Sequence, residues 1–420
     1  MLQIDHIYEF FNTSLFKEFT VFSLPSGVID PLSVSNLNYS DFIIFNKNNS
    51  EYKIFFYDQE PILPYIIDPC LIIFKYPEKQ KYLTASALWD ELKVNPLPSF
   101  CIDEITLDDL FIEHQKNLAN PRRLFKLSII ATSEKSKEVN DLNIKDLYYF
   151  FHGFAALDWY RGYYALNYSN SIVKEYKHDF VSYNRIINKD RSYRIYWVSK
   201  LTEMKLLDHG QVSFNVTDNP GDDWIDEVAD PNTKLSKHAQ QHAEQHLTNI
   251  SKLVIDKPEL PGSASADIPR EVDALWNIVT ETVFYYDKLH LTEKIFKPIV
   301  SKQPFMLLAA PGNLEYLRSY GFKTFDGIID ESYDKIVDND LRIDAVAEQL
   351  QWYCNLSQEE KQRVIERLAP IVEHNFHHFY GEFKHIITKE LLDNCKTLFK
   401  EIGYDDKTIA YDDIYKVLTN

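Results

Sequence analysis

The chain has 420 residues, of which 45% are hydrophobic, and it carries a formal net charge of −18. That length leaves room for two or three domains with well-buried cores, and the hydrophobic content excludes a disordered or low-complexity protein. The negative charge argues against binding of nucleic acid by the whole surface, although a local basic groove is compatible with it.

The four cysteines are scattered and form no CxxC pair, which is typical of a reduced, intracellular protein. The first residues lack the basic and apolar regions of a signal peptide. No apolar run reaches the roughly 18–20 residues of a membrane span. We therefore expect a soluble, cytoplasmic protein.

Short apolar runs, typical of buried strands, alternate with mixed segments in the first part of the chain. They cover residues 42–45, 54–57, 71–74 and 127–131. Continuous runs of this kind suit a parallel sheet that is covered on both faces. The aromatic stretch 144–168, which includes His152, is predicted to be helical.

A second series of the same kind begins with a strand at 180–183 and a helix over about 192–207. We expect further strands at 212–214, 276–280 and 305–308, loops over 217–236 and 257–269, and helices over 313–320 and from about 343 to the end. The second part of the chain thus repeats the alternation of the first and closes with helices.

Two strand–helix series that join near residue 175 predict an α/β fold of two Rossmann-like, doubly wound lobes that face each other across a cleft. We place the lobes at residues 1–175 and 176–375, and C-terminal helices at 376–420, where they can pack back on the first lobe. In such lobes, ligands bind outside the carboxyl ends of the strands. No GxGxxG and no GxxxxGK[ST] is present, which argues against a dinucleotide-dependent dehydrogenase and a P-loop NTPase.

A carboxylate follows the predicted strand 54–57, in the sequence Asp58-Gln59-Glu60-Pro61. Pro61 stiffens the turn. Glu60 is therefore a candidate general base that takes a proton from an acceptor hydroxyl, if desolvation brings its pKa nearer to neutrality. The alternative is an ordinary acidic residue in a turn.

Arginines gather around the end of the predicted strand 180–183. Arg185 follows this strand, and Arg191 and Arg194 begin the next helix. Guanidinium groups offer paired donors to phosphate oxygens, so this cluster suggests a pyrophosphate clamp. The alternative is a set of charges on a helix surface.

Glu281 ends the predicted strand 276–280 and precedes the triplet Thr292-Glu293-Lys294. Thr292 can cap a helix whose first turn carries Glu293 and Lys294. A helix N-terminus and a lysine favour an anion, while the two glutamates can accept hydrogen bonds from sugar hydroxyls. The alternative is a capped surface helix.

Three histidines, His238, His242 and His246, recur at every fourth position, so a helix would place them on one face where they could bind a metal. No carboxylate or cysteine accompanies them at matching spacing. We therefore expect a solvated helix face and no metal site.

Taken in chain order, these segments resemble family 10 glycosyltransferases, the α-1,3-fucosyltransferase-like enzymes of the GT-B fold. The resemblance covers about residues 178–330 and rests on Phe180-Val181-Ser182-Tyr183-Asn184, Arg194, Lys205-Leu206-Leu207-Asp208-His209-Gly210, Glu281 and Thr292-Glu293-Lys294, with Glu60-Pro61 earlier in the chain. The blocks 321–325 and 330–334 look like those of a divergent branch that includes phage-type enzymes. The resemblance implies that Arg194 and Lys294 contact donor phosphates, that Glu281 and Glu293 face the donor, and that Glu60 is the base.

We therefore predict a glycosyltransferase that moves a sugar from a nucleotide-diphosphate donor to an acceptor hydroxyl with inversion, and that needs neither a metal nor a cofactor. The candidate catalytic residues are Glu60 and, as second choice, His152. The candidate donor-binding residues are Arg185, Arg194, Glu281, Thr292, Glu293 and Lys294. The expected acceptor is a glycan; the alternatives are a hydroxymethylated base of phage DNA and, in another class, a non-catalytic sugar-binding module.

Overall fold

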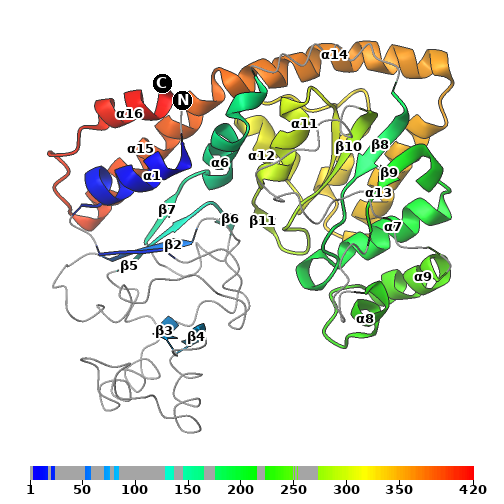
Figure 1. Ribbon diagram of the computed structural model, residues 1–420, viewed down its shortest axis with the longest axis horizontal. Helices are drawn as coiled ribbons and strands as arrows, with labels where there is room; N and C mark the ends of the chain where they lie inside the picture. Colours follow the sequence, from blue (N-terminus) through cyan, green and yellow to red (C-terminus); the bar gives the residue numbers. More distant parts are fainter. Residues whose placement is uncertain are drawn as a thin grey trace, which may run out of the picture. The chain divides into compact units, whose positions relative to one another are not determined.

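A computed structural model of the chain describes residues 3–17, 20–23, 53–57, 71–75, 80–84, 128–136, 145–164, 176–214, 223–248, 250, 253 and 273–420. These residues form a mixed α/β protein with parallel sheets (Figure 1). The chain divides into two compact units: unit 1 holds residues 1–3, 152–387 and 419–420, and unit 2 holds residues 4–151 and 388–418. The sequence predicts a junction near residue 175, whereas the units divide after Phe151.

Unit 2 contains a four-stranded parallel sheet in the order β1-β2-β5-β7. Its strands are β1 (Thr20–Ser23), β2 (Lys53–Tyr57), β5 (Ser128–Thr132) and β7 (Lys145–Tyr148). The strands predicted at 54–57 and 127–131 are thereby confirmed. The short strand β6 (Lys135–Ser136) also falls in this unit.

Two expectations for this part of the chain were wrong. β3 (Leu71–Lys75) pairs antiparallel with β4 (Gln80–Thr84) instead of joining the parallel sheet, because an apolar run does not reveal the direction of its partner. Residues 145–148, predicted to be helical, form β7 beside β5. Pairing with a neighbouring strand determines the structure here, and aromatic residues are common in strands. The strand predicted at 42–45, the candidate base Glu60 and the loop predicted at 257–269 lie outside the described residues.

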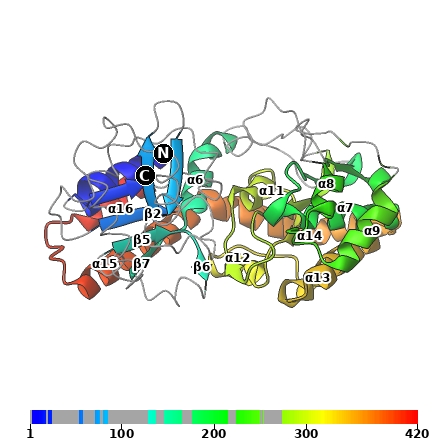
Figure 2. The same ribbon diagram turned by 90° about the horizontal axis from the view of Figure 1, so that it is seen from below.

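Helices from both ends of the chain pack together in unit 2. They are α1 (Ile4–Phe10), the π-helical turn η1 (Phe11–Leu15), α15 (Phe383–Ile402) and α16 (Tyr411–Thr419). Figure 2 shows α1, α15 and α16 close together beside the sheet. The rings of Phe16 and Phe399 meet edge to face with centroids 5.6 Å apart. Asn394 Nδ2 donates to the Tyr148 carbonyl at 2.9 Å, which ties α15 to the end of β7.

Unit 1 contains a second four-stranded parallel sheet, in the order β12-β10-β8-β9. Its strands are β8 (His178–Ser182), β9 (Gly210–Val212), β10 (Ala274–Thr280) and β12 (Phe305–Leu308), with a short β11 (Lys288–Leu289) in the loop between the last two. Every residue of β10 and β12 is buried, as expected for parallel strands covered on both faces. The strands predicted at 180–183, 276–280 and 305–308 are confirmed, while β9 ends at Val212 rather than continuing to Phe214.

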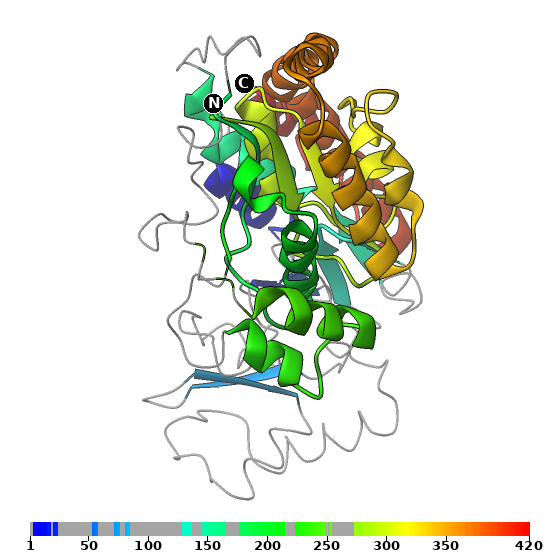
Figure 3. The ribbon, with the colours of Figure 1, turned by 90° about the vertical axis from the view of Figure 1, so that its right-hand side faces the viewer.

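The α-helices of unit 1 are α6 (Phe151–Trp159), α7 (Tyr193–Glu203), α8 (Trp224–Ala229), α9 (Lys237–Leu247), α11 (Phe296–Val300), α12 (Asn313–Ser319), α13 (Asn339–Cys354) and α14 (Gln358–Tyr380). Short 3₁₀ turns are η6 (Arg161–Tyr163), η7 (Lys189–Arg191), η8 (Leu207–His209), η9 (Glu293–Ile295) and η10 (Glu331–Lys335). α9 packs on α7, α7 on α13, and α13 on β12. Figure 3 shows the green helices α7 to α9 as one group.

The helix α8 lies within 217–236, where we had expected only a loop. Its N-terminus is capped by Asp223, whose Oδ1 accepts from the Ile225 N–H at 3.2 Å. A capped helix of this length is too short to show a hydrophobic periodicity, which explains why the pattern did not reveal it. The expected helix at 313–320 and the helical C-terminal part are confirmed.

A buried arginine, Arg342 of α13, joins the loops that follow β10 and β12. Its guanidinium donates to the carbonyls of Ala309 at 3.0 Å, Ile336 at 2.7 Å and Phe284 at 2.9 Å, and it stacks 4.2 Å from the Phe284 ring centroid. Burial lowers the pKa of Arg342 to about 10, so the side chain keeps its charge at neutral pH. One cation therefore satisfies carbonyls that no strand or helix pairs.

Replacing Arg342 by leucine is expected to lower the free energy of unfolding by about 3 kcal/mol, because several buried carbonyls lose their donor. Chemical denaturation measures the change. The matched control is Arg363→Leu on the exposed face of α14, which should shift stability by less than about 0.5 kcal/mol. Equal effects of the two substitutions would contradict this account of Arg342.

Candidate functional site

The winding of the sheet in unit 1 reverses at the carboxyl ends of β8 and β10. From β8 the chain passes to β9 on one side, and it then returns to β10 on the other side of β8. In open α/β sheets, ligands bind in the crevice outside the strand ends where the winding reverses in this way. The residues that follow the two strands here are Tyr183-Asn184 and Glu281-Thr282.

Glu281 is fully buried and holds the start of the next helix in place. Its Oε1 accepts from the Thr292 N–H at 3.1 Å, and its Oε2 accepts from Thr292 Oγ1 at 2.6 Å and from the Thr282 N–H at 3.2 Å. Burial raises the pKa of Glu281, against the opposing charge of Lys294. Both carboxylate oxygens thus serve the protein itself, so Glu281 orients this segment through Thr292.

Thr292 caps the turn that carries Glu293 and Lys294, as the sequence predicted. The Nζ of Lys294 lies 3.0 Å from Thr292 Oγ1, 3.2 Å from Thr282 Oγ1 and 3.3 Å from Glu293 Oε1. Its side chain remains 31% exposed. An ammonium group held among two hydroxyls and a carboxylate, yet open to solvent on one side, is placed to receive an anion. We refer to Glu281, Thr282, Thr292, Glu293 and Lys294 as the Glu281 cluster.

Glu293 is buried beside His152, the second candidate for the base. Its Oε2 lies 3.5 Å from His152 Nδ1, and the His152 ring meets the His290 ring edge to face at 5.2 Å. Burial alone would raise the pKa of Glu293, but the charge of Lys294, the charge that His152 carries when protonated, and the charge of Lys297 together lower it to about 2. Two glutamates of one cluster therefore have pKa values shifted in opposite directions, a pattern typical of functional sites.

Arg194 has a different position from the one that a phosphate clamp would need. Its side chain is buried in α7, where Nη1 donates to the Ile186 carbonyl at 2.8 Å and Nη2 donates to the Thr280 carbonyl at 2.6 Å. Arg194 thus fixes the loop after β8 to the end of β10. Arg185 lies exposed in that loop. Of the two arginines predicted to bind phosphate, Arg194 is buried and supports the backbone at these strand ends, and Arg185 is exposed.

Two sets of side-chain contacts at this end of the sheet could not be predicted from any motif in the sequence. Tyr193 of α7 donates its hydroxyl to the Glu281 carbonyl at 2.6 Å and stacks on Phe284, with ring centroids 4.0 Å apart. Tyr286 donates to Asp190 at 3.0 Å, and Lys234 contacts both of these side chains. The one signal in the sequence was that Tyr286 follows closely after Glu281 in the chain.

Comparison of the sequence and the structure with known proteins adds no relative: no family model, no curated protein and no solved structure matches the chain. Among the described residues, no helix is both long enough and apolar enough to cross a membrane. The two groups of potential metal ligands in the described part of the chain contain none of the Glu281 cluster.

Replacing Thr292 by valine should lower the free energy of unfolding by about 2 kcal/mol, because the buried Glu281 carboxylate loses a charge-assisted hydrogen bond. Thr292→Ser retains the hydroxyl and should cost less than about 1 kcal/mol. Chemical denaturation of both variants measures the difference. A serine variant as unstable as the valine variant would refute the role of the hydroxyl.

Glu293 should contribute stability that depends on pH in a defined direction. Its folded pKa of about 2 lies below its usual value of 4.5, so the contribution is present above pH 4.5 and is lost as the pH falls toward 2. The unfolding free energies of the wild type and of Glu293→Gln, measured from pH 7 to pH 2.5, should therefore converge in acid, by up to about 3 kcal/mol. A difference that stays constant over this range would contradict the shift.

Proposed function

We propose that the chain is a nucleotide-sugar-dependent glycosyltransferase of the GT-B type, with the donor bound at the carboxyl ends of β8 and β10. The observation that carries the proposal is the Glu281 cluster at the point where the winding of a parallel sheet reverses. Its one partly exposed cation, Lys294, lies at a capped N-terminal turn, where an anion is favoured. A second unit with its own parallel sheet is consistent with the two lobes of GT-B.

In this proposal some residues stabilise charge on the donor, and others hold those residues in position. Lys294 offsets part of the negative charge that develops on the diphosphate as the bond between the sugar carbon and the phosphate oxygen breaks. Glu293, ionised through its low pKa, holds the Lys294 ammonium group and the His152 ring in place for the donor. Glu281 and Arg194 act as positioning residues, because their polar atoms hold Thr292 and the Thr280 carbonyl.

The acceptor hydroxyl loses its proton as its oxygen bonds to the sugar carbon. His152 is the candidate base within the described residues, since Glu293 lies 3.5 Å from its Nδ1 and can stabilise the imidazolium that forms. Glu60 remains the other candidate, as the resemblance to family 10 enzymes implies. A glycan is the proposed acceptor, and the cluster itself requires no metal for the departure of the diphosphate.

The test is release of a nucleoside diphosphate from a panel of nucleotide sugars, with and without saccharide acceptors. Lys294→Ala should lower turnover at least about tenfold, the loss typical when one group that stabilises developing charge is removed. The control is Lys323→Ala, an exposed lysine of the same unit, which should retain wild-type turnover. Unchanged turnover in Lys294→Ala, or donor binding without any turnover in the wild type, would contradict the proposal, and the second result would identify a sugar-binding module.

A further inference from the structure

A carboxylate from α7 completes a group of potential metal ligands with two histidines of α9. His242 and His246 lie one turn apart on α9, and their rings are 4.4 Å apart. Glu203, the last residue of α7, approaches them from the neighbouring helix. One ligand atom of each residue lies within 4.8 Å of the others.

The distances fit two ligands of one small cation. Glu203 Oε2 lies 3.2 Å from His242 Nε2. Two ligand atoms bound tetrahedrally at 2.0–2.1 Å from zinc are about 3.3 Å apart. Apart from Glu203 itself, His242 Nε2 is buried with no hydrogen-bond partner among the described groups, so the nitrogen that faces Glu203 can bind a cation.

The surroundings of the group orient its central ligand. Ser199 Oγ lies 2.8 Å from His242 Nδ1, on the side of the ring opposite to Glu203. A hydrogen bond to the second ring nitrogen is the usual way in which proteins fix the tautomer and orientation of a metal-bound histidine. Lys200 Nζ contacts the same oxygen of Glu203, Oε2, at 2.6 Å and lies 3.3 Å from Asp344 Oδ1. A cation bound by Oε2 would replace Lys200 there and leave it Asp344 as its carboxylate partner.

We propose that Glu203, His242 and His246 bind a zinc ion that links α7 to α9. Two imidazoles and one carboxylate form a ligand set that zinc accepts, with water in the fourth position. The three histidines alone had led us to expect no metal, because the carboxylate comes from a different helix and no spacing along the chain reveals it. The site involves no residue of the Glu281 cluster, so it stands independently of the proposed glycosyltransferase.

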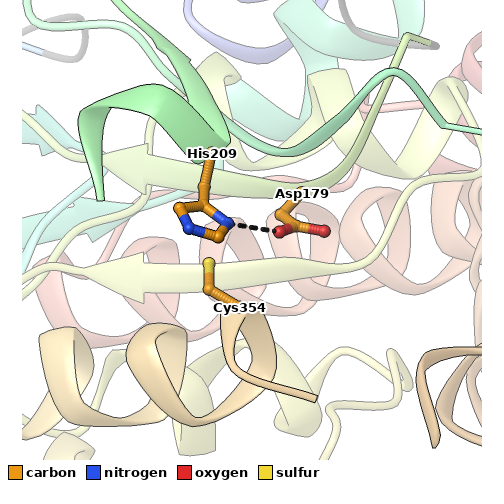
Figure 4. A group of neighbouring side chains, drawn as sticks. All are labelled: Asp179, His209 and Cys354. Atoms are coloured by element: carbon orange, nitrogen blue, oxygen red, sulfur yellow. Dashed lines mark hydrogen bonds and ion pairs between the residues drawn. The ribbon is translucent and has the colours of Figure 1, made fainter. Parts of the chain in front are cut away.

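A second group, Asp179, His209 and Cys354, is a weaker candidate for a metal (Figure 4). Lys361 Nζ binds both Asp179 oxygens, at 2.7 and 2.8 Å, and His209 Nδ1 lies 2.9 Å from the same carboxylate. Burial and the nearby Asp179 raise the pKa of Cys354 to about 12, so its thiol stays protonated. Lys361 already holds both oxygens of Asp179, whereas Lys200 contacts a single oxygen of Glu203. We therefore interpret the second group as an internal ion-pair network.

The test is titration of the untagged full chain, stripped with a chelator, with zinc chloride in a calorimeter. We expect one zinc ion per chain, and at least about tenfold weaker binding in His246→Ala and in Glu203→Gln, since loss of even an outer partner of a metal ligand costs that much. Both residues are at least partly exposed, and metal-free melting temperatures equal to that of the wild type would show that the variants fold.

The matched controls separate this site from its neighbours. His238→Ala removes a histidine one turn earlier on α9, and His209→Ala removes a ligand of the second group. Both should bind zinc as the wild type does. Absence of zinc binding in the wild type, or a loss in either control as large as that in His246→Ala, would overturn the proposal.

Discussion

The bond between the Glu281 carboxylate and Thr292 is the interaction on which the candidate site depends. A buried carboxylate is costly unless its oxygens are satisfied, and here three donors from two segments satisfy it. Because Thr292 also caps the turn that follows, the same bond fixes where Glu293 and Lys294 begin. The position of the partly exposed Lys294 thus follows from a residue that no ligand needs to touch.

The loops around that bond are supported by buried cations that bind backbone carbonyls. Arg194 joins the loop after β8 to the end of β10, and Arg342 joins the loops after β10 and β12. Loops at the carboxyl ends of parallel strands leave carbonyls without strand partners, and a guanidinium can satisfy several of them at once. These two arginines allow irregular backbone to be buried beside a polar site.

Much of the fold was predictable, because the strands of a covered parallel sheet appear as continuous apolar runs. The apolar runs correctly predicted β2, β5, β8, β10 and β12. The prediction failed for β7, because this strand lies in the aromatic stretch 144–168, which we expected to be helical. At the site, the capping role of Thr292 followed from local chemistry. The hydrogen-bond partners of Arg194 could not be predicted, because any residue can supply a backbone carbonyl. The approach of Glu203 to His242 could not be predicted either, because it depends on the packing of α9 on α7.

The proposed function requires that the carboxyl ends of β8 and β10 bind a nucleoside diphosphate through Lys294. Thermal shift with a panel of nucleoside diphosphates and their sugars tests it without any assumption about the acceptor. The account predicts that at least one nucleotide at saturating concentration raises the melting temperature of the wild type by about 3 °C or more, and that Lys294→Ala abolishes the shift. A panel in which no nucleotide stabilises the wild type, or in which Lys294→Ala is stabilised equally, would contradict it.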